Sequence, residues 1–144
     1  MVCLGNICRS PLAEEIMRSK LSSEHLVDSA GTGDWHIGHL PDKRSIAIAA
    51  KKGLDLTHQR GRQFNISDFE TFDHIFVMDN SNYKDVMALA PDDAAKAKVK
   101  LILNELFPNE NVDVPDPYFV GVEGFENVYN MLDAACNEIA KQLI

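Results

Sequence analysis

The residues best suited to chemistry lie at the start of the chain, where Cys3 precedes Arg9 by six positions. Ser10 and Pro11 follow, and a serine N-cap with a first-turn proline predicts that a helix begins there. Gly5 is expected to let the preceding loop bend sharply inward. Backbone amides and the positive end of the helix dipole would then converge on one anion. Arg9 can hold two phosphate oxygens, and the same field would keep Cys3 as a thiolate. The loop therefore predicts phosphoryl transfer to sulfur.

The string from Val2 to Pro11, VCLGNICRSP, resembles the phosphate-binding loop of the low-molecular-weight protein tyrosine phosphatases, whose signature reads V-C-x-G-N-x-C-R-S-P. The resemblance continues in family order along most of the chain. The other matching blocks are residues 27–32 (VDSAGT), 35–38 (WHIG), 72–73 (FD), 78–82 (MDNSN) and 116–118 (DPY).

The resemblance implies hydrolysis of phosphotyrosine and small aryl phosphates through a phosphocysteine intermediate. Cys3 would be the nucleophile and Arg9 the phosphate clamp. A leaving phenolate needs a proton, so a carboxylic acid must face the sulfur, and the resemblance assigns Asp116 as general acid and later base. Pro115 and Pro117 restrict the backbone on both sides of it. Taken without the Cys3 loop, the same residues are also typical of a rigid turn with a surface aspartate.

The resemblance also assigns supporting residues around the phosphate. Ser29 and His58 match positions that hydrogen-bond Asn6, whereas a histidine in a polar segment is otherwise more often exposed. Trp35, Tyr118 and Phe119 are predicted to wall a deep cleft that admits a phenyl ring and keeps shorter phosphoserine away from the sulfur. The remaining loop residues expected to cradle or support phosphate are Leu4, Gly5, Asn6, Ile7, Cys8 and Ser10.

The other cysteines have different expected roles. Cys8 is either a small core residue or a redox partner, since the resemblance suggests that a Cys3–Cys8 disulfide protects the nucleophile from irreversible oxidation. Both readings stay open, because thiol exposure decides between them. Cys136 lies on the apolar face of the last predicted helix and is expected in the core. The histidines show no metal-ligand spacing with the cysteines, so neither a metal nor another cofactor is expected.

Strands and helices alternate along the chain, which predicts an α/β fold with helices on both faces of a parallel sheet. The resemblance implies one doubly wound domain over residues 1–144, with four strands in the order 2-1-3-4. Only Met1 and Val2 precede Cys3, so the first strand is expected to be largely missing. The other strands are predicted near 26–31, 73–78 and 99–103, and helices from 10 to 21, from 42 (stopped by Gly53), after a cap at Asn80 or Ser81, and from 123 to 143.

The composition limits the classes of partner that are expected for this chain. The 144 residues carry a formal charge of −8, which argues against nucleic acid, whose phosphates need a basic face. The sequence has no apolar run of membrane-spanning length, so no membrane partner is expected. Three cysteines without a secreted disulfide pattern indicate a reducing, cytoplasmic setting. The expected partners are a tyrosine-phosphorylated protein or peptide and a phosphate or other oxyanion in the active site.

Three alternative functions share parts of this pattern. Thioredoxin-coupled arsenate reductases resemble the loop but need further cysteines, and residues 73–115 contain none. Protein arginine phosphatases carry threonine where this chain has Ile7, whose bulk favours a flat phenyl ring. A phosphotyrosine-binding module could keep Arg9 but would not need Cys3 or Asp116, and both are present.

Overall fold

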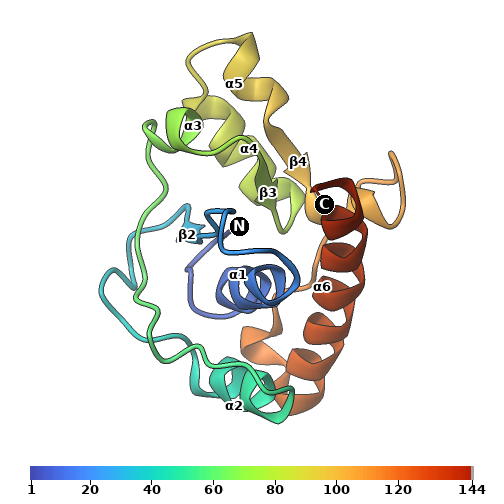
Figure 1. Cartoon of the computed structure of the whole chain (residues 1–144). Helices are drawn as coiled ribbons and strands as arrows, with labels where there is room; N and C mark the ends of the chain where they lie inside the picture. Colours follow the sequence, from blue (N-terminus) through green and yellow to red (C-terminus); the bar gives the residue numbers. More distant parts are fainter. Residues whose placement is uncertain (144) are drawn as a thin grey trace.

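Four short parallel strands form the centre of the molecule in a computed structural model that describes residues 1–143 (Figure 1). They are β1 (Val2–Cys3), β2 (Ala30–Gly31), β3 (Ile75–Val77) and β4 (Val99–Leu101). Their order is β2-β1-β3-β4, as the sequence resemblance implies. Strand β1 has only two residues, yet it pairs with both neighbours, Val2 opposite Ala30 and Val77. The short central strand is therefore enough to place Cys3 at the carboxyl edge of the sheet.

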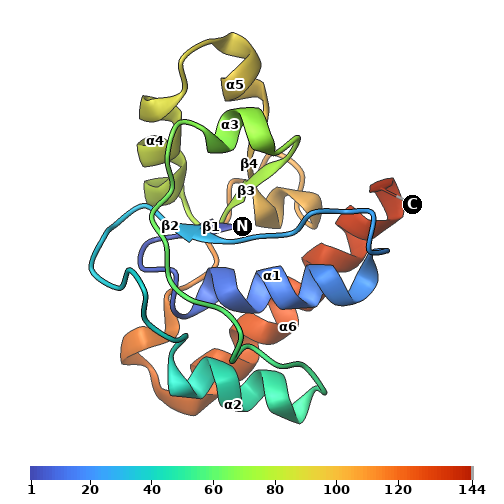
Figure 2. The ribbon, with the colours of Figure 1, turned by 60° about the vertical axis from the view of Figure 1, so that its left-hand side comes forward.

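Helices cover both faces of this sheet, as expected (Figure 2). On one face α1, α2 and α6 pack together, and on the other face α4 and α5 lie against β3 and β4, with α3 beside them. The helices are α1 (Arg9–Lys20), α2 (Lys43–Lys51), α3 (Asp68–Thr71), α4 (Asn80–Leu89), α5 (Asp93–Ala97) and α6 (Gly121–Leu143), and the 3-10 turns are η1 (Ile102–Glu105) and η2 (Pro117–Phe119).

Each face has its own hydrophobic core, and strand alternation explains the division. Ile75 and Val77 of β3 point into the core under α4, whereas Phe76 between them joins the core shared by α1, α2 and α6. Helix α6 presents its apolar stripe to the second of these cores, and Cys136 is fully buried within it, as predicted. These two cores fix the sheet edge from which the Cys3 loop rises.

Three local expectations were wrong. Residues 26 and 27 are not part of a strand, because β2 begins at Ala30 and Leu26 is 70% exposed. Ser10 does not cap α1, which begins one residue earlier, because its hydroxyl is taken by Cys3 and Asn6. Neither Asn80 nor Ser81 caps α4, whose N-cap is Asp79. The Ser10 hydroxyl instead belongs to the site described below, and Asp79 both caps α4 and reaches that site.

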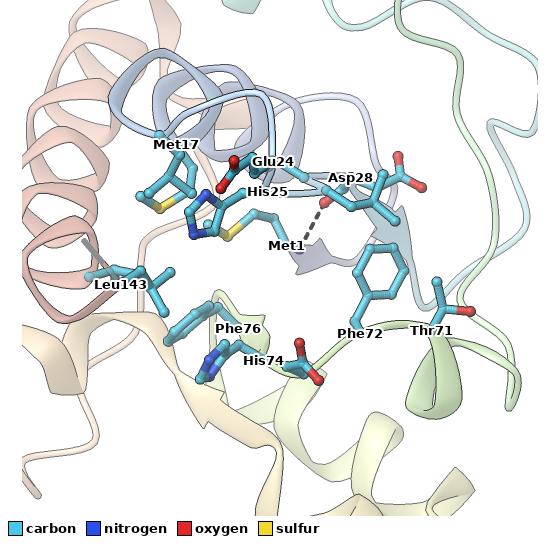
Figure 3. A pocket seen from close by; sticks show the side chains of 15 residues that line it. Met1, Met17, Glu24, His25, Asp28, Thr71, Phe72, His74, Phe76 and Leu143 are labelled. Atoms are coloured by element: carbon cyan, nitrogen blue, oxygen red, sulfur yellow. Dashed lines mark hydrogen bonds between the residues drawn. The ribbon is translucent and has the colours of Figure 1, made fainter.

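A cavity of about 400 Å³ lies beside Met1, away from the Cys3 loop. Side chains of α1, α6 and the start of β3 surround it, including Met17, Leu143 and Phe76, and the Met1 nitrogen lies 3.0 Å from the Asp28 carbonyl oxygen (Figure 3). None of the predicted site residues lines it. Over residues 1–143, no helix combines the length and apolarity needed to cross a bilayer, and no cluster of three or more His, Cys, Asp or Glu is arranged to hold a metal ion.

Candidate active site

The loop between β1 and α1 turns its carbonyl groups outward. The Cys3 and Leu4 carbonyls accept hydrogen bonds of 2.9 Å from the amides of Thr32 and Gly33. Further along the loop, the Ile7 carbonyl accepts from the Asp42 amide at 2.8 Å and the Cys8 carbonyl accepts from Ser45 Oγ at 3.1 Å. The segment after β2 and the start of α2 therefore hold the loop from outside.

The outward orientation of these carbonyl groups determines where the backbone amides of the loop point. In a planar trans peptide the N–H of the next residue lies opposite the carbonyl. The amides of Leu4, Gly5, Cys8 and Arg9 are consequently directed to the inside of the loop, and α1 begins at its end. Inward amides at a helix N-terminus are the arrangement that binds an anion. The anion site predicted from the sequence is thus present in the backbone geometry.

The loop backbone differs from expectation at one position. Gly5 was expected to provide the sharp bend, but the residue with a left-handed conformation is Asn6, at φ 55°. A side chain at position 5 would instead be crowded, because a Cβ there would lie 3.1 Å from Cδ2 of His36. The His36 ring packs directly on the loop, and the sequence reasoning gave this histidine no role.

Cys3 lies at the base of the loop, and its sulfur has two hydrogen-bonding neighbours. Ser10 Oγ is 3.0 Å away, and the Asn6 amide donates to the sulfur over 3.3 Å. The thiol is 2% exposed, yet it lines a cleft of about 170 Å³ that opens above the loop. Cys3 is therefore shielded from the sides and reachable from the cleft.

Arg9 extends across the carboxyl edge of the sheet and is held at one end. Its Nη1 donates to Asp79 Oδ2 at 2.7 Å and to the Val114 carbonyl at 3.0 Å. Burial alone would lower the pKa of Arg9, but the charges of Cys3, Asp79 and Asp116 outweigh it and raise the pKa above its ordinary value. The guanidinium is thus a fixed, permanently charged group beside the sulfur.

Asp79 was missed in the sequence reasoning, although it belongs to one of the matching blocks. It comes two residues after β3, so it reaches the same sheet edge as the Cys3 loop. One of its oxygens caps α4 by accepting from the Asn82 amide at 2.7 Å, and the other holds Arg9. A carboxylate after a buried central strand is the feature that could have revealed it.

Asp116 faces the cleft from the segment that leads into η2. Its Oδ2 lies 3.7 Å from Arg9 Nη2, and its Oδ1 accepts from the Tyr118 amide at 3.1 Å. The side chain is 43% exposed, so water reaches it. Pro117 starts the 3-10 turn directly after it. The structure thus brings a restrained carboxyl group to the same cleft as Cys3 and Arg9.

The three predicted aromatic walls all line the cleft, together with Leu4 and Ile7. Trp35 comes from the loop after β2, and Tyr118 and Phe119 come from η2, where their rings meet edge to face at 4.9 Å. Arg44 lies 5.4 Å from the Tyr118 ring centroid and supports that wall from α2. The opening has the flat aromatic lining that a phenyl ring requires.

Asn6 connects the loop to the protein interior. Its Nδ2 donates to Ser10 Oγ at 2.8 Å and to Ser29 Oγ at 3.0 Å, and its Oδ1 accepts from the Arg62 amide at 3.0 Å. The expected contact with Ser29 is confirmed. Ser29 in turn donates to the buried carboxylate of Glu14 at 2.6 Å, a residue that the sequence reasoning did not single out.

The expected contact between His58 and Asn6 is wrong. The Nε2 of His58 lies 3.0 Å from Glu15 Oε2, and the ring is half-exposed. The Arg62 amide occupies the Asn6 oxygen that His58 was expected to approach. His58 reaches the loop only through a chain of ion pairs, in which Arg18 joins Glu15 to Glu14.

Cys8 is buried, although it belongs to the lining of the cleft, and all three cysteines are free thiols. Burial, reinforced by the charge of Asp42, raises the pKa of Cys8 to about 12. Burial likewise raises the pKa of Cys136 to about 12. These two thiols are therefore protonated at neutral pH and are poor nucleophiles.

Comparison with known proteins agrees with this geometry. The family model described as low molecular weight phosphotyrosine protein phosphatase matches residues 1–144. A low molecular weight phosphotyrosine protein phosphatase of Schizosaccharomyces pombe is 40% identical over 137 residues, covering 91% of this chain and 86% of the relative.

Two solved structures are similar over nearly the whole chain. Vibrio vulnificus Wzb in complex with benzylphosphonate has a TM-score of 0.89 and 30% identity, covering 98% of this chain and 94% of that one. A Drosophila arginine phosphatase has a TM-score of 0.87 and 32% identity, covering 99% and 94%. The same fold thus accompanies both a benzylphosphonate complex and an arginine phosphatase among its relatives.

Proposed function

This chain belongs to the low molecular weight phosphotyrosine protein phosphatase family, and we propose that residues 1–144 act as one catalytic domain in which Cys3, Arg9 and Asp116 carry out the hydrolysis. The observation that carries the proposal is the position of the Cys3 sulfur. It lies at the base of a loop in which residues 3, 4, 7 and 8 turn their carbonyl groups outward, and Arg9 and Asp116 line the same cleft.

In the first step the Cys3 thiolate attacks the phosphorus of an aryl phosphate. The S–P bond forms while the P–O bond to the phenol breaks, and Asp116 gives its proton to the leaving oxygen. The loop amides and Arg9 bind the equatorial oxygens, where negative charge is stabilised throughout. The Asn6 amide donates a hydrogen bond to the sulfur, and Ser10 Oγ lies 3.0 Å from it, so both groups hold the sulfur in place.

In the second step water attacks the phosphocysteine. Asp116, now ionised, takes a proton from the water, the S–P bond breaks, and inorganic phosphate and the Cys3 thiolate are released. The half-exposed position of Asp116 supports this dual role, because the water must approach from the cleft side. Arg9 holds the phosphoryl group in both steps while Asp79 holds Arg9.

A phosphorylated tyrosine side chain is the proposed substrate because of the cleft walls. Trp35, Tyr118 and Phe119 offer flat surfaces to a ring, and the benzylphosphonate complex of the Vibrio relative pairs a similar ring with a phosphorus oxyanion. The arginine phosphatase among the structural neighbours keeps phosphoarginine as a second candidate. Ile7 favours tyrosine, since it adds an aliphatic side chain to the cleft and no hydroxyl for a guanidinium.

Arsenate reduction fits the chain less well. Beyond the Cys3 loop the only further cysteine is Cys136, which is buried in α6 and so cannot supply electrons to arsenate at the cleft. Free thiols and a thiolate nucleophile suit a reducing compartment, so we propose a cytoplasmic location.

The experiment that tests this proposal compares four substrates at equal concentration: phosphotyrosine, phosphoserine and phosphoarginine peptides, and arsenate with thioredoxin. The proposal predicts the highest kcat/KM on the phosphotyrosine peptide. A higher kcat/KM on phosphoarginine, or turnover of arsenate alone, would assign the chain to one of the alternatives.

A further inference from the structure

Exposed apolar side chains are concentrated around the cleft. Among the described residues, eight of the thirteen exposed large apolar side chains lie on three loops: the Cys3 loop, the segment after β2, and η2 with the start of α6. Four of these eight line the cleft itself. The other four, which we call the apolar rim, are Ile37, Leu40, Val120 and Val122.

The apolar rim is continuous with the cleft walls along the chain. Ile37 and Leu40 follow Trp35, and Val120 and Val122 follow Phe119. The segment after β2 and the first turn of α6 lie on the same side of the molecule as the start of α1 (Figure 2). The four rim residues are 48–66% exposed, so about half or more of each lies in water, and a cluster of such side chains marks a binding surface.

The volume of the cleft limits how much of a protein substrate can enter it. At about 170 Å³ it is smaller than the ~300–1,000 Å³ pockets that hold drug-sized ligands. One phosphorylated aromatic side chain occupies such a space, so the neighbouring residues of a protein substrate must lie outside, over the rim.

The charges near the rim limit the chemistry of those neighbours. Segments 33–44 and 114–126 carry five carboxylates, namely Asp34, Asp42, Asp116, Glu123 and Glu126, against the cations Lys43 and Arg44. Exposed Arg60 adds a third cation beside them, because Gly61 forms backbone hydrogen bonds with Gly38 and His39. Arg44 is paired with Asp42 at 3.0 Å, and Arg9 is buried beneath the cleft. His36 and His39 lie in the first of these segments. Acidic flanking residues would therefore meet like charge, which is costly at an interface.

We propose that the apolar rim docks the residues that flank phosphotyrosine in the protein substrate, and that these residues are apolar and not acidic. This inference rests on the proposed function, because it places phosphotyrosine in the cleft. Apolar burial supplies affinity on the rim, while the excess of carboxylates excludes acidic sequences.

The test uses three phosphotyrosine peptides of equal length at pH 8, flanked by Leu/Ile/Val, by Ser/Gly or by Asp/Glu. The expected order of kcat/KM is apolar, then neutral polar, then acidic, with about tenfold between the first two, since each ~1.4 kcal/mol of burial is tenfold. Added salt should narrow the acidic disadvantage and leave the apolar preference unchanged.

Rim variants separate this inference from the proposed function. In Ile37→Ser/Val122→Ser the apolar preference should fall to within about twofold, while kcat/KM on p-nitrophenyl phosphate, which has no flanks, stays the same. The matched control Ile66→Ser/Leu89→Ser changes two similarly exposed side chains elsewhere and should keep the preference. Equal kcat/KM on the three peptides, a preference for acidic flanks, or full preference in the rim variant overturns the inference. Absence of p-nitrophenyl phosphate turnover in the unaltered protein overturns the proposed function instead.

Discussion

Asp79 Oδ2 lies 2.7 Å from Arg9 Nη1, and this contact joins the segment after the central strand β3 to the cation that lines the cleft with Cys3. Both side chains are largely buried, at 18% and 3% exposure. A charge-assisted hydrogen bond in such surroundings fixes the guanidinium plane and leaves Nη2 directed toward Asp116. Asp79 is therefore a positioning residue that acts through Arg9.

We predict that Asp79→Asn lowers kcat/KM on p-nitrophenyl phosphate about 10- to 100-fold, because a hydrogen bond to a charged group contributes ~1.5–3 kcal/mol. Asparagine keeps the oxygen that caps α4, so helix stability should change little. Asp92→Asn, at the N-cap of α5, is the matched control and should leave kcat/KM unchanged. Normal kcat/KM in Asp79→Asn would remove Asp79 from the positioning of Arg9.

Asp116→Asn tests the proton donor. Asparagine keeps the hydrogen bond from the Tyr118 amide but cannot give a proton to the leaving group. The rate on phenyl phosphate should fall by ~10²–10⁴. The loss on p-nitrophenyl phosphate should be smaller, since its leaving group needs a proton less. An equal loss on both substrates would contradict general acid catalysis, and no loss would place the acid elsewhere.

The packing of His36 on Gly5 gives a paired prediction. In Gly5→Ala the new methyl group would meet the imidazole at 3.1 Å and displace either the ring or the loop. We expect a loss of about tenfold in kcat/KM, because small shifts of reacting groups are costly. Gly5→Ala/His36→Ala removes the obstacle and should recover most of the activity. A double variant as slow as Gly5→Ala would show that the glycine is needed for another reason.

The buried thiols Cys8 and Cys136 predict a loss of stability in alkali. In the folded protein the pKa of each is raised from 9.0 to about 12. Between these values the unfolded chain ionises its thiols while the folded protein does not, so the free energy of unfolding falls as pH rises from 9 to 12. At pH 10 the loss should be about 1 kcal/mol for each thiol.

Urea denaturation at pH 8 and pH 10 measures this loss. The variant Cys136→Ala is the control and should lose less stability between the two pH values, although it starts from a lower value because of the cavity it creates. A loss that is the same in both proteins would contradict the assignment to Cys136.

The chemistry of the Cys3 loop could be predicted from the sequence because the residues that form it are close together along the chain. Cys3, Asn6, Arg9 and Ser10 lie within one turn and one helix start, where spacing alone places them. Asp116 was predicted from the proton that the leaving group needs, and both it and the strand order also drew on family resemblance. The aromatic walls of the cleft were likewise predicted from the family resemblance.

What the sequence did not reveal depends on contacts between distant segments. The role of Asp79 requires Arg9, at the start of α1, to reach the segment after β3, and the buried Glu14 carboxylate is paired with Ser29. His58 was misplaced because the Arg62 amide already occupies the Asn6 oxygen. Ser10 was expected to cap α1 by local rules, but Cys3 and Asn6 compete for its hydroxyl. Helices α3 and α5, with four and five residues, are too short to show periodicity.

The most direct test of the central claim is to trap the phosphorylated enzyme. Asp116→Asn is mixed with p-nitrophenyl phosphate, quenched by denaturation within the first turnover, and mapped by peptide mass spectrometry. The mechanism predicts one phosphoryl group on Cys3, none on Cys8 or Cys136, and no turnover in Cys3→Ser. A phosphoryl group on another residue, or normal turnover by Cys3→Ser, would contradict it.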